Sequence, residues 1–127
     1  MAKILIVDDD HSFVEGLKEV LSGQGFAVVC AYNGDEGLRM AHEEKPDLVL
    51  LDVMMTTDSE GFEVAKKLRE DPVTRQMPII LLTGIRKAKQ LPFSFEPDED
   101  WLPVTAVLEK PVHPEDLIRR IRETLKA

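Results

Sequence analysis

The apolar positions of this chain alternate between two spacings along its length. Five short runs are apolar at nearly every position, and they lie at residues 4–7, 27–31, 48–51, 79–82 and 104–108. Runs of this kind are typical of strands buried on both faces. Most of the intervening segments place apolar residues three or four positions apart, as in a helical stripe. The pattern therefore predicts strands and helices in alternation.

Local signals mark the starts of three predicted helices. Asn33, with Glu36 three residues later, is a variant of the capping box. Pro114 suits the first position of the last helix, and the acidic residues that follow it suit a helix start. Asp10 is expected to cap the first helix. These signals place helices after the first, second and fifth strands.

Alternation of apolar strands with helices predicts a parallel sheet covered on both faces and joined by right-handed crossovers. This is a doubly wound α/β fold. The 127 residues fit one domain spanning residues 1–127. In such folds, functional sites form at the carboxyl ends of the strands.

Polar residues follow the predicted strands at those ends. They are Asp8, Asp9 and Asp10 after the first strand, Asp52 after the third, Thr83 after the fourth and Lys110 after the fifth. Carboxylates at neighbouring strand ends repel one another, and a divalent cation relieves the repulsion. Oxygen ligands with room for water suit Mg²⁺, while a hydroxyl and an ammonium group suit phosphoryl oxygens. The set predicts phosphoryl transfer with Asp52 as the nucleophile, giving an aspartyl phosphate.

Composition narrows the expected partners. Sixteen Lys and Arg against 24 Asp and Glu give a net charge of −8, which argues against direct binding to nucleic acid. No apolar run approaches the roughly 20 residues of a membrane helix. The chain enters a strand-like segment at once, without the pattern of a secretion signal, so a cytoplasmic location is expected.

Four segments carry distinctive sequence in a fixed order. They are residues 4–10 (ILIVDDD), 46–55 (PDLVLLDVMM), 78–84 (PIILLTG) and 109–111 (EKP). In both content and order they resemble the motifs of response-regulator receiver domains, the phosphoacceptor modules of two-component signalling and phosphorelays. The similarity runs from residue 3 to about 126 and is interrupted only between 85 and 103. It implies a flavodoxin-like sheet with strand order 2-1-3-4-5.

The resemblance also implies a metal site. Asp52 would accept a phosphoryl group from a sensor histidine kinase or a phosphotransfer protein, with Mg²⁺ as cofactor. Asp9 and Asp52 would bind Mg²⁺ directly, and Asp8 would bind it through water. The backbone carbonyl of Met54 would complete the protein ligands.

Two further residues gain roles from the resemblance. Thr83 would report the phosphoryl group by moving towards it, and Lys110 would contact the group directly. Such a phosphoprotein is not an enzyme in the usual sense, because it catalyses only its own phosphorylation and dephosphorylation. Its output is a changed interaction surface for a downstream protein.

The segment 85–103 departs from the family pattern. It holds three prolines, which cannot sit inside a regular helix, so the fourth helix is expected to be shortened or replaced by a proline-rich loop. The rings of Phe93, Phe95 and Trp101 would either cover the sheet or form an exposed surface for a partner or a homodimer. Val107 stands where the family usually has an aromatic switch residue. These four residues are the predicted output surface.

Two other functions compete with this one. Asp8 and Asp10 also fit the Asp-x-Asp pattern of Mg²⁺-dependent phosphohydrolases of the haloacid dehalogenase type. That alternative leaves Asp52 unexplained and lacks the Gly-Thr expected after Asp10. A receiver-like adaptor that is never phosphorylated is the second alternative, and the complete set of acidic, threonine and lysine residues argues against it.

Overall fold

The computed structural model describes residues 2–52, 60–84, 106–110 and 113–126. The strands in this part are β1 (Lys3–Val7), β2 (Ala27–Ala31), β3 (Leu48–Asp52), β4 (Ile79–Gly84) and β5 (Ala106–Lys110). The helices are α1 (His11–Gly23), α2 (Gly34–Glu44), α3 (Glu60–Glu70) and α5 (Pro114–Lys126). Strands and helices alternate from β1 to β4, as the hydrophobic pattern predicted, and α5 follows β5. None of these helices combines the length and apolar character that crossing a lipid bilayer requires.

The strands form one parallel sheet with the order β2-β1-β3-β4-β5. This confirms the predicted order 2-1-3-4-5. In register, Val7 at the end of β1 lies opposite Ala31 on one side and Leu51 on the other. The carboxyl ends of the three strands β2, β1 and β3 are therefore level.

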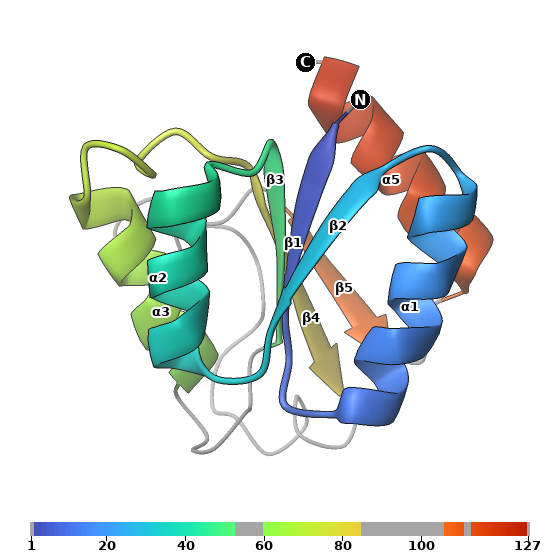
Figure 1. Ribbon diagram of the computed structural model, residues 1–127, viewed down its shortest axis with the longest axis horizontal. Helices are drawn as coiled ribbons and strands as arrows, with labels where there is room; N and C mark the ends of the chain where they lie inside the picture. Colours follow the sequence, from blue (N-terminus) through green and yellow to red (C-terminus); the bar gives the residue numbers. More distant parts are fainter. Residues whose placement is uncertain (1, 53–59, 85–105, 111–112, 127) are drawn as a thin grey trace.

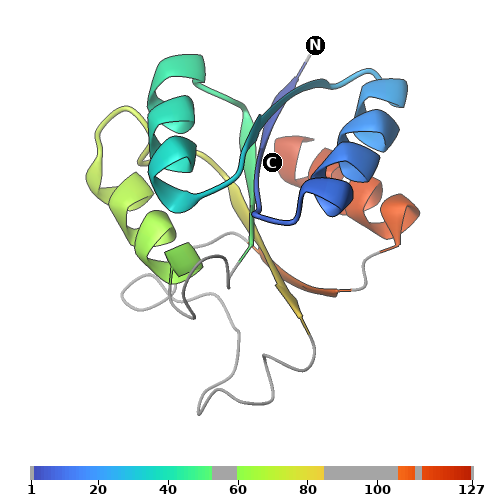
Figure 2. The same ribbon diagram turned by 60° about the horizontal axis from the view of Figure 1, so that its bottom comes forward.

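Helices cover both faces of the sheet, with α1 and α5 on one side and α2 and α3 on the other (Figures 1 and 2). Successive residues of a strand point to opposite faces, so each strand supplies both cores. Leu5 and Leu51 belong to the core under α2 and α3, while Ile6 and Leu50 belong to the core under α1 and α5. All four side chains are fully buried. This double burial explains why the strand sequences are apolar throughout.

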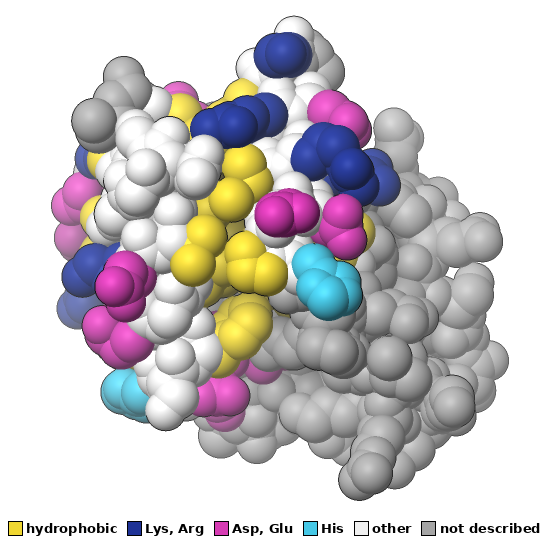
Figure 3. All heavy atoms as spheres, turned by 90° about the vertical axis from the view of Figure 1, so that its right-hand side faces the viewer, with side chains coloured by type: hydrophobic (Ala, Val, Ile, Leu, Met, Phe, Trp, Pro, Cys, Tyr) yellow, Lys and Arg dark blue, Asp and Glu magenta, His cyan; other side chains and the backbone are white. Residues whose placement is uncertain are grey.

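The core under α1 and α5 reaches the surface between these helices. Partly buried residues packed against it include Phe13, Val20, Phe26 and Leu125. Figure 3 shows hydrophobic atoms on this side of the molecule between charged side chains. The guanidinium of Arg122 lies over the ring of Phe26, 5.9 Å from its centroid.

The predicted caps are confirmed. The Glu36 N–H donates to Asn33 Oδ1 at 2.8 Å, and the Phe13 N–H donates to Asp10 Oδ1 at 3.1 Å. The close packing of α2 on β1 requires a glycine at position 37, because a Cβ added at Gly37 would lie 2.8 Å from Val7 Cγ1. The absence of a side chain there lets α2 approach the end of β1.

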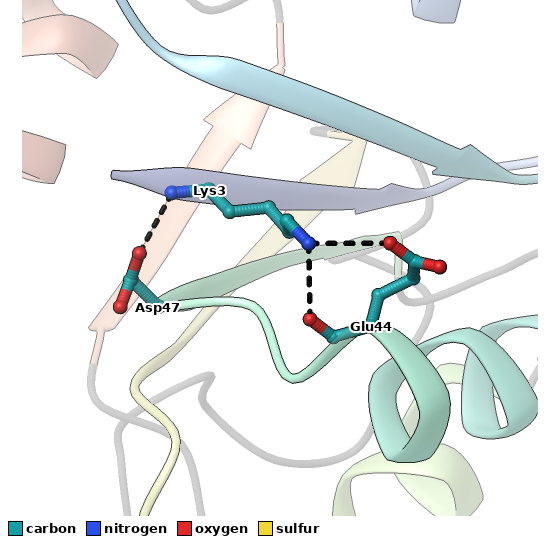
Figure 4. A network of polar contacts seen from close by, with 3 residues as sticks. All are labelled: Lys3, Glu44 and Asp47. Carbon is teal, nitrogen blue, oxygen red and sulfur yellow. Dashed lines mark hydrogen bonds and ion pairs between the residues drawn. The ribbon is translucent and has the colours of Figure 1, made fainter. Parts of the chain in front are cut away.

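Lys3 joins three segments at the amino end of the sheet (Figure 4). Its backbone N–H donates to Asp47 Oδ2 at 2.7 Å. Its Nζ donates to the carbonyl oxygen and to Oε1 of Glu44, both at 3.2 Å. The start of β1 is thereby held to the end of α2 and to the residues before β3.

Some boundaries differ from the predicted ones. Asp52 and Thr83 are inside β3 and β4, and β5 continues to Lys110, two residues past the end of the apolar run. Parallel pairing continues past the last apolar residue, since backbone groups of polar residues pair equally well. The proline-rich segment predicted in place of the fourth helix lies outside the described residues.

Candidate functional site

The site is built where β1 and β3 end side by side. Val7 and Leu51 are partners in the parallel ladder, so the residues that follow them, Asp8 and Asp52, are neighbours. Two motifs far apart in the sequence are thus joined by strand pairing alone. The placement agrees with the rule that sites of doubly wound folds form at the carboxyl ends of strands.

Three carboxylates meet at this point. One oxygen each from Asp8, Asp9 and Asp52 lies within 4.8 Å of the other two. Asp8 is 1% exposed and Asp52 is 6% exposed, whereas Asp9 is exposed to solvent. The cluster therefore has a buried base and one open side. Carboxylates this close repel one another unless a cation or hydrogen-bond donors offset their charge.

The three consecutive aspartates after β1 have different surroundings. The Asp8 N–H donates to the Ala31 carbonyl at 3.1 Å, and Asp8 Oδ1 accepts from the Asp10 N–H at 2.9 Å. Asp10 turns its own carboxylate to the start of α1 as the cap. Asp9, between them, makes no hydrogen bond or ion pair with the described residues and joins the cluster through its exposed carboxylate.

The donor set fits a divalent cation. All three ligands are carboxylate oxygens, the type that Mg²⁺ prefers. Opposite ligands of an octahedral Mg²⁺ are about 4.2 Å apart, given Mg–O distances of about 2.1 Å. A spread of at most 4.8 Å needs little closure to reach that geometry. The cluster could therefore hold Mg²⁺ with water at its open side.

The other predicted site residues are placed by their backbone or lie outside the described part. Leu82 pairs with Asp52, so Thr83 comes one residue beyond that level on β4. Lys110 ends β5 opposite Gly84, and Val107 lies on β5 opposite Leu81. Met54, Phe93, Phe95 and Trp101 fall outside the described residues. The structure brings together Asp8, Asp9 and Asp52.

One feature of this region was not predicted. The imidazole of His11 and the ring of Tyr32 are stacked, with centroids 4.1 Å apart and planes 2° from parallel. Tyr32 Oη donates to Glu15 Oε1 at 3.4 Å. Partial burial and the nearby thiol of Cys30 and carboxylate of Glu15 raise the pKa of Tyr32. The available signal was that Tyr32 directly follows the second predicted strand and His11 follows the three aspartates after the first.

Comparison with known proteins decides the family. Residues 4–122 match the family model described as the response regulator receiver domain. The chain belongs to this family. The resemblance found in the four motifs is thereby confirmed, and the chain is a receiver domain of the two-component type. Asp52, which the phosphohydrolase alternative left unexplained, belongs to one of those motifs.

Relatives of this receiver domain include longer regulators. It is 42% identical over 84 residues to the response regulator PleD of Caulobacter vibrioides, covering 66% of this chain and 18% of PleD. It is 38% identical over 128 residues to the transcriptional regulatory protein CpxR of Escherichia coli K12, covering 99% of this chain and 50% of CpxR. The chain thus spans half or less of these two curated relatives.

The fold also matches solved structures. A putative response regulator from Chloroflexus aurantiacus superposes with a TM-score of 0.82 at 29% identity, covering 99% of this chain and 98% of the other. A CheY-like receiver domain protein from Methanospirillum hungatei gives a TM-score of 0.80, also at 29% identity, covering 99% and 94%. These likenesses confirm the flavodoxin-like α/β architecture.

Proposed function

We propose that this receiver domain carries a phosphoryl group on Asp52 as a signal, with Mg²⁺ as cofactor. The observation that supports the proposal most directly is the meeting of three carboxylates at the carboxyl end of the sheet. A site for charge neutralisation beside a nucleophilic carboxylate is what phosphoryl transfer to aspartate requires. The donor is a phosphohistidine of a sensor kinase or a phosphotransfer protein.

In the proposed transfer, a carboxylate oxygen of Asp52 attacks phosphorus. An O–P bond forms as the P–N bond of the donor phosphohistidine breaks, and the released imidazole takes up a proton. The donor approaches from the open side of the cluster, where Asp9 is exposed. The Asp52 side chain is almost fully buried, but the cluster is open on the side of Asp9. A phosphoryl group on Asp52 would therefore extend towards that open side.

The other residues of the site bind Mg²⁺ or the oxygens of the phosphoryl group. Asp9 and Asp52 hold Mg²⁺ directly, Asp8 holds it through water, and the Met54 carbonyl completes the protein ligands. Bound Mg²⁺ supplies neutralisation of the carboxylate and phosphoryl oxygens. The proposal gives two further roles to the ends of β4 and β5, which pair with each other in the sheet. The Thr83 hydroxyl and Lys110 ammonium bind phosphoryl oxygens.

The proposed output is a change of surface. Phe93, Phe95, Trp101 and Val107 form the surface that a downstream protein or a second copy of the chain would contact. The domain acts on no separate substrate, so its enzymatic chemistry is limited to gaining and losing its own phosphoryl group. CpxR is named a transcriptional regulatory protein, and that name describes a relative of which this chain covers half.

Incubation with acetyl phosphate and Mg²⁺ tests the proposal. Intact-mass spectrometry should show one phosphoryl adduct in the wild type and in Asp35→Ala, an exposed aspartate in the first turn of α2. Asp52→Ala should show none. An adduct that persists in Asp52→Ala and is lost in Asp8→Ala would favour the phosphohydrolase alternative. A wild type without any adduct would favour the adaptor that is never phosphorylated.

A further inference from the structure

We propose that Tyr32 is a positioning residue for the acidic cluster and that it acts through His11. The inference rests on the proposed function, because it assigns a device that sets the affinity of the same site for Mg²⁺. Tyr32 touches no member of the cluster in any described contact. Its effect comes from the way it holds the loop on which Asp8 and Asp9 lie.

Tyr32 contacts α1 at two points one turn apart. Its ring stacks on the imidazole of His11, the first residue of the helix, and its hydroxyl donates to Glu15. A helix normally frays at its first turn, where backbone N–H groups have no partner within the helix. A flat ring against the first side chain and a hydrogen bond one turn later restrain that motion.

Both ends of the loop between β1 and α1 contact the carboxyl end of β2, at the adjacent residues Ala31 and Tyr32. At its start, the Asp8 N–H donates to the carbonyl of Ala31, the last residue of β2. At its end, His11 lies against Tyr32, the next residue along. Asp9 is between these two attachments. The position of its exposed carboxylate follows from the backbone that they hold.

Two hydrogen bonds extend this restraint across the loop. The Asp10 N–H donates to Asp8 Oδ1, and Asp10 Oδ1 accepts from the Phe13 N–H. Movement of the first turn of α1 would therefore shift Asp10 and, through it, the carboxylate of Asp8. Loss of the stacked ring should loosen two of the three carboxylates of the cluster, Asp8 and Asp9, together.

The expected effect is moderate. An aromatic pair contributes about 0.5–1.5 kcal/mol beyond the area it buries. If most of that free energy is used to hold the loop, its loss weakens Mg²⁺ binding by about 2- to 10-fold. The nucleophile itself is on β3, so the stack leaves the identity of the phosphorylated residue unchanged.

The test is the Mg²⁺ dissociation constant of the unphosphorylated protein, measured by isothermal titration calorimetry. Tyr32→Ala and His11→Ala should each bind Mg²⁺ about 2- to 10-fold more weakly than the wild type. Tyr32→Phe keeps the stacked ring and loses only the long 3.4 Å hydrogen bond to Glu15, so its loss of Mg²⁺ affinity should be smaller than that of Tyr32→Ala. The double variant should bind no more weakly than either single variant, since both remove the same contact. Arg122→Ala, which removes a ring contact elsewhere on the same face, should leave the affinity unchanged.

Three results would overturn the inference. They are wild-type affinity in Tyr32→Ala, equal losses in Tyr32→Ala and Tyr32→Phe, or additive losses in the double variant. His11 is exposed, so His11→Ala tests the stack even where Tyr32→Ala fails to fold. Failure of the proposed function is seen separately, as absence of a phosphoryl adduct on the wild type whatever its affinity for Mg²⁺.

Discussion

At the amino end of the sheet, charged groups lie beside groups of opposite sign. Lys3 Nζ is 3.2 Å from Glu44 Oε1, and its backbone N–H binds the Asp47 carboxylate. His42 Nδ1 is 2.9 Å from Asp71 Oδ2, which links the last turn of α2 to the residue after α3. These contacts join neighbouring segments and place a nitrogen donor beside each of these carboxylates.

At the carboxyl end, charges of the same sign are brought together. Asp8, Asp9 and Asp52 place carboxylate oxygens within 4.8 Å of one another, two of them on buried side chains. Such an arrangement raises the free energy of the metal-free fold unless other groups compensate. One end of the sheet thus joins groups of opposite charge, and the other end gathers groups of like charge. This contrast supports the proposed binding of a cation at the carboxyl end, and substitutions at each end test it.

The largest effect is expected at the amino end, at Arg69. Its Nη1 donates to the carbonyls of Arg75 at 2.8 Å and Met77 at 2.6 Å, and burial lowers its pKa. Arg69→Met keeps an apolar stem but leaves these carbonyls without their charged donor. The free energy of unfolding should fall by about 1–3 kcal/mol in urea denaturation.

The same variant checks whether the two ends are independent. Mg²⁺ affinity should remain that of the wild type, since Arg69 lies at the opposite end of the sheet from the acidic cluster. A variant that lost stability and Mg²⁺ affinity in parallel would show that the amino end also shapes the site. In that case the contrast between a stabilising end and a binding end would be wrong.

A smaller effect of opposite sign is expected at Asp9. Asp9→Asn removes one of three like charges and should stabilise the metal-free protein by about 1 kcal/mol or less, the scale of one exposed charge pair in water. The same change should remove most of the thermal stabilisation that Mg²⁺ gives the wild type. Melting curves with and without Mg²⁺ measure both effects.

Asp35→Asn is the matched control for that pair of measurements. It removes an exposed carboxylate from the first turn of α2, away from the cluster, and should leave the response to Mg²⁺ intact. If Asp9→Asn instead lowered the stability of the metal-free protein, repulsion within the cluster would not be the dominant interaction of this carboxylate.

Features set by local pattern and strand order could be predicted from the sequence. Apolar runs located the strands, and strands of a doubly wound fold bring their carboxyl ends together, so the meeting of Asp8 and Asp52 followed. The N-caps at Asp10 and Asn33 followed as well, because a cap depends on residues only three positions away. In each of these cases the deciding interaction is local or is fixed by topology.

Contacts that depend on the spacing between packed elements could not be predicted. The pairing of His42 with Asp71 needs a particular separation of α2 and α3, and the stack of His11 on Tyr32 needs a particular position of α1 over β2. Packing of the two cores sets both. β5 continues to Lys110, two residues past the end of its apolar run, since backbone pairing with β4 leaves no trace in hydrophobicity.

The smallest expected effect is the pH dependence due to Asp71. Its Oδ1 accepts from the Val73 N–H at 2.9 Å and its Oδ2 faces His42, and these hydrogen bonds lower the pKa of its carboxyl group in the folded protein. A lowered pKa means that the unfolded chain takes up this proton first as the pH falls. The contribution is therefore full above the ordinary aspartate pKa of about 3.9 and is lost as pH falls through the lower folded value.

Asp71→Asn should flatten the acid limb of stability between pH 5 and pH 2, as recorded by urea denaturation at a series of pH values. The effect should be small because the carboxylate is exposed and its ion pair with His42 is screened by solvent. His42→Ala should reproduce part of the change, since it removes one of the two hydrogen bonds and leaves the other. An acid limb that is the same in Asp71→Asn and in the wild type would mean that the amino end owes its stability to Arg69 and Lys3, with no measurable part from this pair.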